Sequence, residues 1–181
     1  SQFINQAFIT SPFEYCVKNK IKFKVIMFSM ERSSIFTLAK WMAAKIFKDT
    51  GEIIDLSILL GWKKGAKLTE EQLAMTVNTN KYFNYVEKYI DIYEGQKTSD
   101  QIEAIVDKYA MANGYIEDGI YRPNVEDEFV IVVLDHLGLI SKGGNKSKKD
   151  AIDKTVEYLQ KMRDLYGYAN VNVIQINRDF L

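Results

Sequence analysis

The spacing of apolar residues divides the first 51 residues into a helix, a strand and a second helix. Helical spacing marks the opening segment, where Pro12 favours an interruption or a kink. The run 22–30 begins with alternation and then turns continuously apolar, which is typical of a strand in the middle of a sheet covered on both faces. Ser33 or Ser34 can then cap a helix that ends near Gly51.

Two capping boxes, in each of which a threonine precedes a glutamine by three residues, define helices in the middle of the chain. The pairs are Thr69 with Gln72 and Thr98 with Gln101. Each pair precedes an amphipathic segment, so we expect helices over 70–88 and 99–113, and Gly114 should close the second in the manner of a C-terminal glycine. The alternation of 89–93 predicts a short strand between the two helices.

The strongest strand signal of the chain is the run 129–134. It consists of β-branched and other apolar residues without alternation, which indicates a buried, parallel, central strand. An acidic stretch around 117–128, broken by Pro123, precedes this run and is expected to be irregular.

The last part of the chain predicts a loop, a helix and a strand. The loop covers 141–149, Asp150 can cap a helix that runs to about Tyr166, and 171–176 has the pattern of a strand. Strands that alternate with helices imply an α/β fold, here a three-layer α/β/α sandwich with a mainly parallel central sheet. No internal repeat is visible, and we expect a single domain.

Composition limits the class of protein. In 181 residues, 47% are apolar, which is enough to bury one domain's core, and no apolar run approaches the roughly 20 residues that cross a bilayer. We therefore expect a soluble, cytoplasmic protein. The 24 basic and 24 acidic residues cancel, so any contact with a polyanion must be local. Cys16 and His136 are the only residues of their types, which excludes a tetrahedral Cys/His zinc site.

Polar residues that could carry chemistry lie where the predicted strands end. Glu31 follows the first strand, Asp135 and His136 follow the central one, and Gln175 and Arg178 lie at the end of the last. Ligands of open parallel sheets bind beyond the carboxyl ends of the strands. A nucleotide-phosphate site with magnesium requires a carboxylate for the ion, a second to activate water, and a polar sensor of the γ-phosphate. Each residue alone would also suit an ordinary strand end, but together they favour such a site.

Three segments resemble motifs of bacterial replicative helicases of the DnaB type. The segment 24–31, which ends Phe-Ser-Met-Glu, is similar to the strand that ends Phe-Ser-Leu-Glu in that family. The segment 130–140 resembles the Walker B strand, and its Asp-His-Leu form is closer to phage hexameric helicases. The segment 172–178 resembles the element that carries the γ-phosphate sensor. Their order and spacing agree over essentially the whole chain, and the resemblance implies a RecA-like ATPase motor domain.

The start of the chain resembles the helix that follows the family's phosphate-binding loop, Gly-x-x-x-x-Gly-Lys-Ser/Thr. Ser1 would then be the residue whose hydroxyl coordinates magnesium. The resemblance implies that 1–181 is the core of a single RecA-like domain, truncated at both ends. The Walker A glycines and lysine, the arginine finger and a second DNA-binding loop would lie outside it.

The resemblance also implies roles for the remaining candidates. Glu31 matches the catalytic base that polarises the attacking water, Asp135 the acid that holds magnesium through water, and Gln175 the sensor that couples the γ-phosphate to DNA. Arg178 would face a phosphate or a neighbouring subunit, and His136 is expected to be a hydrogen-bonded residue beside the site. ATP and Mg²⁺ are the implied cofactors.

The predicted loop 141–149 contains four lysines and no acidic residue. These are Lys142, Lys146, Lys148 and Lys149. The loop occupies the position of one that, in ring helicases, faces the central channel and binds single-stranded DNA. Its glycines allow the backbone to approach phosphates, and its lysines release counterions on binding. At another position in a chain, such a run of charges would be an ordinary solvated loop. Here the position of the loop favours contact with DNA. Because the loop contains no aromatic residue to stack on bases, we expect DNA binding to be independent of DNA sequence.

The leading hypothesis is an ATP-driven replicative DNA helicase motor. It would act as a homo-oligomeric ring, a hexamer, on single-stranded DNA, with a primase or helicase loader as a further partner. Two alternatives stay open: a RecA- or KaiC-type ATPase with a recombination or regulatory role, and a non-catalytic RecA-like module that binds a helicase, DNA or subunits.

Overall fold

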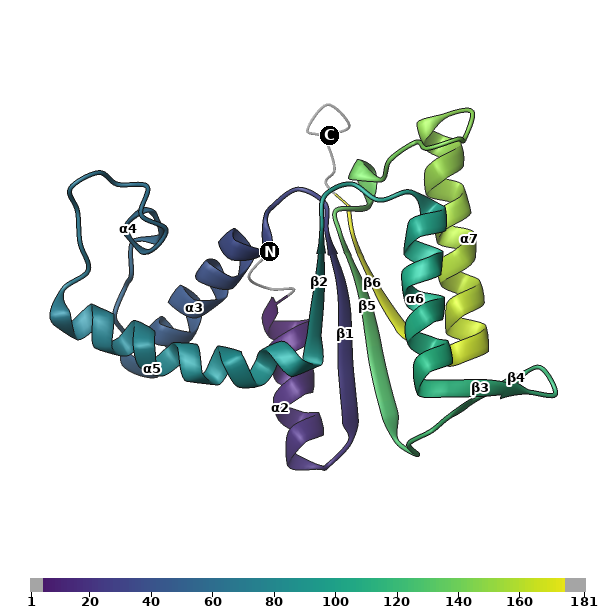
Figure 1. Cartoon of the computed structure of the whole chain (residues 1–181), viewed down its shortest axis with the longest axis horizontal. Helices are drawn as coiled ribbons and strands as arrows, with labels where there is room; N and C mark the ends of the chain where they lie inside the picture. The colour runs from purple at the N-terminus through teal and green to yellow at the C-terminus, as the bar shows by residue number, and fades with distance from the viewer. Residues whose placement is uncertain (1–4, 175–181) are drawn as a thin grey trace.

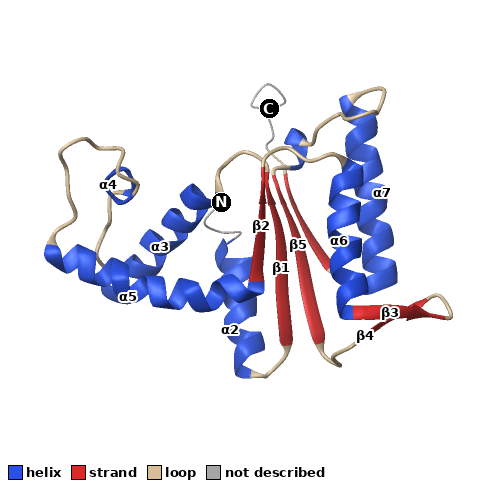
Figure 2. Cartoon of the chain, in the orientation of Figure 1, coloured by secondary structure: helices blue, strands red, loops and turns tan. Residues whose placement is uncertain are grey.

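Within the described residues, 5–174, four parallel strands form the central sheet in the order β2-β1-β5-β6 (Figure 2). In this computed structural model their bounds are Lys22–Ser29 (β1), Ile90–Glu94 (β2), Glu128–Asp135 (β5) and Ala169–Val173 (β6). The strands β1 and β5 pair along their full length and occupy the middle. The two segments that the sequence marked by continuous apolar runs are therefore central strands, as predicted.

Helices cover both faces of the sheet (Figure 1). On one face lie α6 (Ser99–Asn113) and α7 (Lys148–Tyr166). On the other lie the π-helical η1 (Asn5–Thr10) and α2 (Ser11–Lys18), with Pro12 in the first turn of α2, where its missing N–H costs nothing. The predicted three-layer sandwich is confirmed. None of the helices in 5–174 is long and apolar enough to cross a membrane.

Two further helices form an arm beside β2. α3 (Ser34–Thr50) and α5 (Glu70–Val86) pack against each other, and the short α4 (Leu56–Leu59) lies in the connection between them (Figure 1). Ser33 and Gly51 cap α3 as predicted, and the capping boxes of α5 and α6 both form.

The core divides into two halves because neighbouring side chains of a strand point to opposite faces. The side chains that face α6 and α7 are Ile26, Phe28, Val130, Val132 and Leu134. The side chains that face α2 and the inner ends of α3 and α5 are Val25, Met27, Ile131 and Val133. Each of these side chains is at most 3% exposed. Both faces of β1 and β5 are therefore fully covered, which explains why their sequences do not alternate.

The acidic stretch expected to be irregular contains an antiparallel hairpin of β3 (Gly114–Glu117) and β4 (Ile120–Pro123). Its two-residue turn is Asp118-Gly119, with φ of 51° and 77°. Asp-Gly is a strong hairpin signal, because both residues tolerate positive φ. The acidic composition and Pro123 made this stretch resemble an irregular segment. Pro123 is compatible with the hairpin because it lies at the end of the edge strand β4, where proline is tolerated.

Gly114 does not close α6 in the predicted manner. It is extended, with φ of −171°, and it opens β3. A Cβ there would lie 2.5 Å from the Tyr121 ring and from the Arg122 carbonyl. The glycine is therefore explained by the close approach of β4 and not by a left-handed helix cap.

The start of α7 also differs from the prediction. Ser147, not Asp150, is the N-cap, and Asp150 is its capping-box partner: the Ser147 amide donates to the Asp150 carboxylate at 2.8 Å, and the Asp150 amide donates to the Ser147 hydroxyl at 3.0 Å. The lysine-rich loop therefore ends at Ser147, and Lys148 and Lys149 lie in the first turn of α7.

Two short 3₁₀ segments complete the fold, η2 (Glu87–Tyr89) before β2 and η3 (Leu137–Leu139) after β5. The predicted strand 89–93 begins and ends one residue later than expected. The end of the predicted strand 171–176 lies outside the described residues.

At the amino-terminal end of the sheet, tyrosines surround two carboxylates. Asp107 accepts hydrogen bonds from two tyrosine hydroxyls, at 2.8 and 3.0 Å. Glu128, whose side chain is 2% exposed, accepts from two more, at 3.1 and 3.4 Å, and pairs with Lys22 at 2.8 Å. The tyrosines of this cluster are Tyr109, Tyr121, Tyr158, Tyr166 and Tyr168. The cluster ties α6, α7 and the hairpin to the sheet.

This cluster predicts an alkaline unfolding transition. Burial raises the pKa of Tyr158 and Tyr168, and hydrogen bonds with Asp107 and Tyr121 raise them further. In the unfolded chain tyrosines ionise near pH 10, whereas in the folded protein these two keep their protons above that pH. The free energy of unfolding is therefore unaffected by them below about pH 10, and above it each of the two lowers that free energy by about 1.4 kcal/mol per pH unit. Phenolate absorbance should rise together with the loss of circular dichroism. Ionisation of all tyrosines near pH 10 in a folded protein would contradict this.

Candidate functional site

Three acidic residues lie at the carboxyl edge of the sheet, where β2, β1 and β5 end side by side. The register places Ser29, the last residue of β1, opposite Glu94 on one side and Asp135 on the other. Glu31 follows Ser29 by two residues. Since neighbouring strands lie about 4.8 Å apart, the structure places the predicted carboxylates Glu31 and Asp135 at adjacent strand ends.

A tight turn, residues 30–33, leads from β1 to α3 and carries Glu31. The Ser29 hydroxyl donates to the Arg32 carbonyl at 2.7 Å, and the Met30 amide donates to the Asp135 carbonyl at 2.7 Å. Both Ser29 and the Met30 side chain are buried, whereas Glu31 is exposed. The turn therefore exposes Glu31 immediately beyond the buried edge of the sheet.

Among the residues that the structure describes, neither predicted carboxylate has a side-chain partner. Within residues 5–174, nothing donates a hydrogen bond to the side chain of Glu31 or Asp135, and neither forms an ion pair there. Asp135 is half-buried and fixed through its backbone. Within the described part of the chain, both carboxylates thus lie at the strand ends without a partner.

His136 lies beside the site as a hydrogen-bonded residue, as expected. Its Nδ1 accepts from the Gly138 amide at 3.1 Å. The ring packs so closely over Gly138 that a Cβ there would lie 2.8 Å from it. The histidine therefore shapes the turn after β5.

Glu94 is a third acidic residue of this edge and was missed from the sequence. Its Oε1 accepts a hydrogen bond from the Ser34 amide at 2.7 Å, at the start of α3. Hydrogen bonds from the Ser34 hydroxyl and amide lower its pKa below the ordinary value. The alternation of 89–93 predicts a strand that ends one residue before Glu94, so the sequence pattern does not mark Glu94 as a strand end.

The described acidic residues form no metal centre of their own, so any metal ion here would need further ligands. Among residues 5–174, no three His, Cys, Asp or Glu side chains are grouped to hold a metal. Mg²⁺ that accompanies a nucleotide needs one or two carboxylates, and phosphates and waters supply the other ligands. The open carboxylate of Asp135 satisfies that requirement. Ser1, Gln175 and Arg178 lie outside the described residues, so their roles stay predictions.

The lysine-rich loop, now residues 141–147, lies after η3 at the same edge of the sheet as the acidic residues (Figure 1). Lys142, Lys146 and Lys149 are exposed. Lys148 differs because its Nζ donates to the Ile140 carbonyl. Among the described residues, three of the four predicted DNA-contacting lysines are therefore exposed without a side-chain partner.

Two large apolar hollows among the described residues lie away from this edge. One, of about 480 Å³, lies between α2, α3 and α5 and is lined by residues such as Phe13, Trp41 and Phe83. Another, of about 530 Å³, lies near Ile21 and Phe129 at the opposite end of the sheet. Neither is lined by a carboxylate of the strand ends Glu31, Glu94 or Asp135.

Comparison with known proteins supports the fold. No protein-family profile matches the sequence, and no curated protein matches it either. Among solved structures, the chain is similar to a DnaB-like replicative helicase whose structure was described together with its interactions with primase. The TM-score is 0.63 at 16% sequence identity, over 90% of this chain and 33% of that one. The chain therefore has the RecA-like fold found in this helicase and spans about a third of its length.

The turn that carries Glu31 should depend on the buried hydroxyl of Ser29. Ser29→Ala removes the bond to the Arg32 carbonyl and should lower the free energy of unfolding by about 1–2 kcal/mol in urea denaturation. Ser57→Ala, which removes a half-buried hydroxyl bonded to Asp55, is the control and should change it by less than about 0.5 kcal/mol. Equal effects of the two changes would show that Ser29 has no special part in the turn.

Proposed function

We propose that this chain is the core of an ATP-dependent replicative DNA helicase motor. It would hydrolyse ATP at the subunit interfaces of a hexameric ring and move along single-stranded DNA. One observation carries the proposal: two carboxylates without a partner in residues 5–174, Glu31 and Asp135, lie at adjacent strand ends of a fold shared with a DnaB-like helicase.

In this proposal the two carboxylates have different tasks because their surroundings differ. Asp135 is half-buried at the end of a central strand and would hold Mg²⁺ through water, the ion that neutralises charge on the phosphates. Glu31 is exposed on the turn and would orient the attacking water and accept its proton. Ser1 would be a further magnesium ligand, Gln175 the γ-phosphate sensor, and Arg178 a phosphate or subunit contact. The Walker A loop and the arginine finger would lie before Ser1 and beyond the last strand.

The lysine-rich loop is the proposed contact with single-stranded DNA. Its lysines, with Lys149, give a local positive charge in a chain of zero net charge. The structurally similar DnaB-like helicase interacts with primase, and we propose primase as a partner of this protein as well.

The role of Glu31 is tested in the full-length protein. Glu31→Gln keeps the size of the side chain but removes the base, so the rate of ATP hydrolysis should fall by about 10²- to 10⁴-fold while ATP affinity stays near that of the wild type. Glu126→Gln, on the acidic stretch at the other end of the sheet, is the matched control. An unchanged hydrolysis rate in Glu31→Gln rejects the assignment, and a wild-type protein without magnesium-dependent ATP affinity would favour the non-catalytic module.

The DNA contact is tested by the salt dependence of binding to an oligothymidine strand. Replacing Lys142, Lys146 and Lys149 by alanine should reduce the slope of log affinity against log salt by about 2, because each lost phosphate contact removes about 0.7. The matched control replaces Lys63, Lys64 and Lys67, which lie in the lysine-rich connection between α4 and α5. The proposed contact is wrong if both triple variants change the slope equally.

An assay of the activity on DNA separates the helicase from the recombination ATPase. A helicase should separate the strands of a duplex, whereas a recombination ATPase should catalyse strand exchange.

A further inference from the structure

We propose that residues 94–98, the last residue of β2 and its connection to α6, link the turn that carries Glu31 to the lysine-rich loop, with Glu94 as the positioning residue at the start. The inference rests on the proposed function, in which the Glu31 turn lies on the nucleotide side and the lysine-rich loop lies on the DNA side. Movement on one side would then reach the other through this short segment.

The connection is bonded to both ends of the Glu31 turn. The Glu94 carboxylate accepts from the Ser34 amide at 2.7 Å, after the turn, and the Gly95 amide donates to the Ser29 carbonyl at 3.0 Å, before it. A negative charge at the start of a helix is favourable, and a hydrogen bond to a carboxylate is stronger than one to a neutral group. Displacement of the turn that carries Glu31 must therefore displace Glu94 or break this bond.

The other end of the connection holds the lysine-rich loop. The Ser141 amide donates to the Lys97 carbonyl at 2.9 Å. One residue further, the Thr98 methyl group lies 2.8 Å from the position a Cβ would take on Gly143, so the loop backbone rests directly on this side chain. Gly143 has φ of 55°, a conformation that glycine adopts readily.

The middle of the connection combines exposure with internal bracing. Glu94, Gly95 and Gln96 are exposed, and Gly95 has φ of 73°, so the backbone can shift without disturbing the core. The Lys97 Nζ donates to the Glu94 carbonyl and closes the segment on itself. The segment can therefore move as a small unit. The strand β5 also joins both sides, but it is buried in the centre of the sheet and fixed by pairing on both edges.

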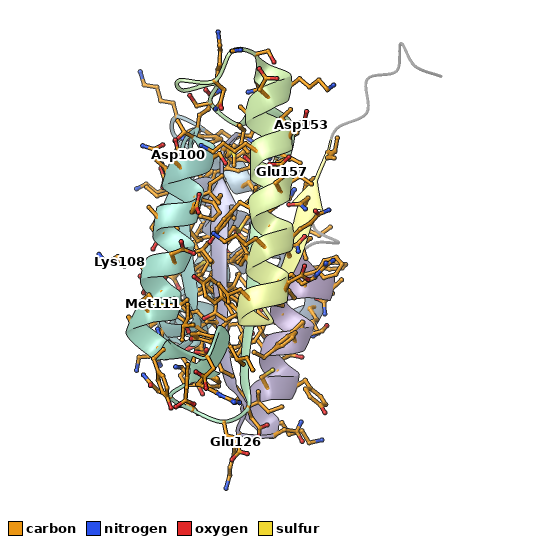
Figure 3. The ribbon with its side chains drawn as sticks, turned by 90° about the vertical axis from the view of Figure 1, so that its right-hand side faces the viewer. Asp100, Lys108, Met111, Glu126, Asp153 and Glu157 are labelled. Atoms are coloured by element: carbon orange, nitrogen blue, oxygen red, sulfur yellow. The ribbon has the colours of Figure 1, made fainter. Side chains whose placement is uncertain are left out.

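The connection continues directly into α6, which limits where motion can go. Thr98 caps α6 in a complete capping box, and α6 is held to α7 by Lys154 with Asp100 at 2.5 Å and by Tyr158 with Asp107 at 2.8 Å. Figure 3 shows these two helices side by side, with Asp100 labelled on α6 and Asp153 and Glu157 labelled on α7. Because the packed helices α6 and α7 resist displacement, motion of residues 94–97 would be passed on to the lysine-rich loop.

Hydrogen exchange of backbone amides in the full-length protein tests the link. The variants are Glu94→Ala, which removes the bond to Ser34, and Thr98→Ser, which keeps the cap but removes the methyl group against Gly143. Asp55→Ala is the matched control, because Asp55 also accepts a backbone amide, that of Ser57 at 2.8 Å, but in the distant arm. Each protein is measured without ligand, with a non-hydrolysable ATP analogue and magnesium, and with an oligothymidine strand.

Without ligand, Glu94→Ala should speed exchange of the Ser34 amide about tenfold and also speed that of the Ser141 amide, which lies across the connection. Thr98→Ser should affect only the lysine-rich loop, and Asp55→Ala neither segment. With the ATP analogue, the wild type should show altered exchange over residues 141–147, and both Glu94→Ala and Thr98→Ser should lose most of that change. A merely local cap at Ser34 would not alter this transmitted response.

Two results would overturn the link. One is faster exchange at Ser34 alone in ligand-free Glu94→Ala, with Ser141 unchanged; this arm needs no nucleotide. The other is a response of residues 141–147 to the ATP analogue that stays of wild-type size in Glu94→Ala. A wild-type protein that binds neither ATP analogue nor DNA would reject the proposed function instead, and the ligand-free arm would still decide whether the two loops are joined.

Discussion

The pairing of β1 with β5 is the constraint on which the rest of this structure depends. The two strands run parallel in register from Lys22 opposite Glu128 to Ser29 opposite Asp135. Because a parallel pair in the middle of a sheet is buried on both faces, it requires helical layers above and below. The same register makes both strands end at one level. The adjacent positions of the Glu31 turn and Asp135 thus follow directly from the pairing that forms the core.

The two ends of this strand pair treat carboxylates in opposite ways. At the amino-terminal end, Glu128 is buried and satisfied by Lys22 and two tyrosine hydroxyls. A buried charge persists only with such partners, so Glu128 has a structural task. At the carboxyl end, Asp135 lacks any described side-chain partner. The contrast separates a residue that holds the fold together from one that has no such part in the described structure.

The elements that burial controls could be predicted from the sequence, and those controlled by close local contacts could not. Continuous apolar runs identified β1 and β5, and Ser33, Thr69 and Thr98 marked helix starts because their side chains bond their own backbone. The capping box of Ser147 was not recognised from the sequence because its N3 residue is an aspartate, Asp150, whereas glutamate or glutamine is the usual partner. Glycine at 114 depends on the approach of Tyr121, a contact that no local pattern contains.

The candidate site was predicted in part for the same reason. Glu31 and Asp135 could be found because each follows a strongly apolar strand. Glu94 follows β2, an edge strand that is only partly buried, and its significance depends on a hydrogen bond across the chain to Ser34. Sequence order gave no indication that residues 94–98 lie between the Glu31 turn and the lysine-rich loop.

The hairpin of β3 and β4 projects from the end of the sheet opposite the acidic edge (Figure 1). An eight-residue strand spans about 26 Å, so a group attached to the hairpin would be separated from the strand ends by roughly that distance. Cys16, the only cysteine, is 3% exposed, and burial raises the pKa of its thiol. A cysteine introduced at Ile116, which is 46% exposed, would therefore take up a fluorophore selectively. The hairpin is thus an attachment point from which energy transfer to labelled DNA could be measured, and it lies away from the proposed DNA contact.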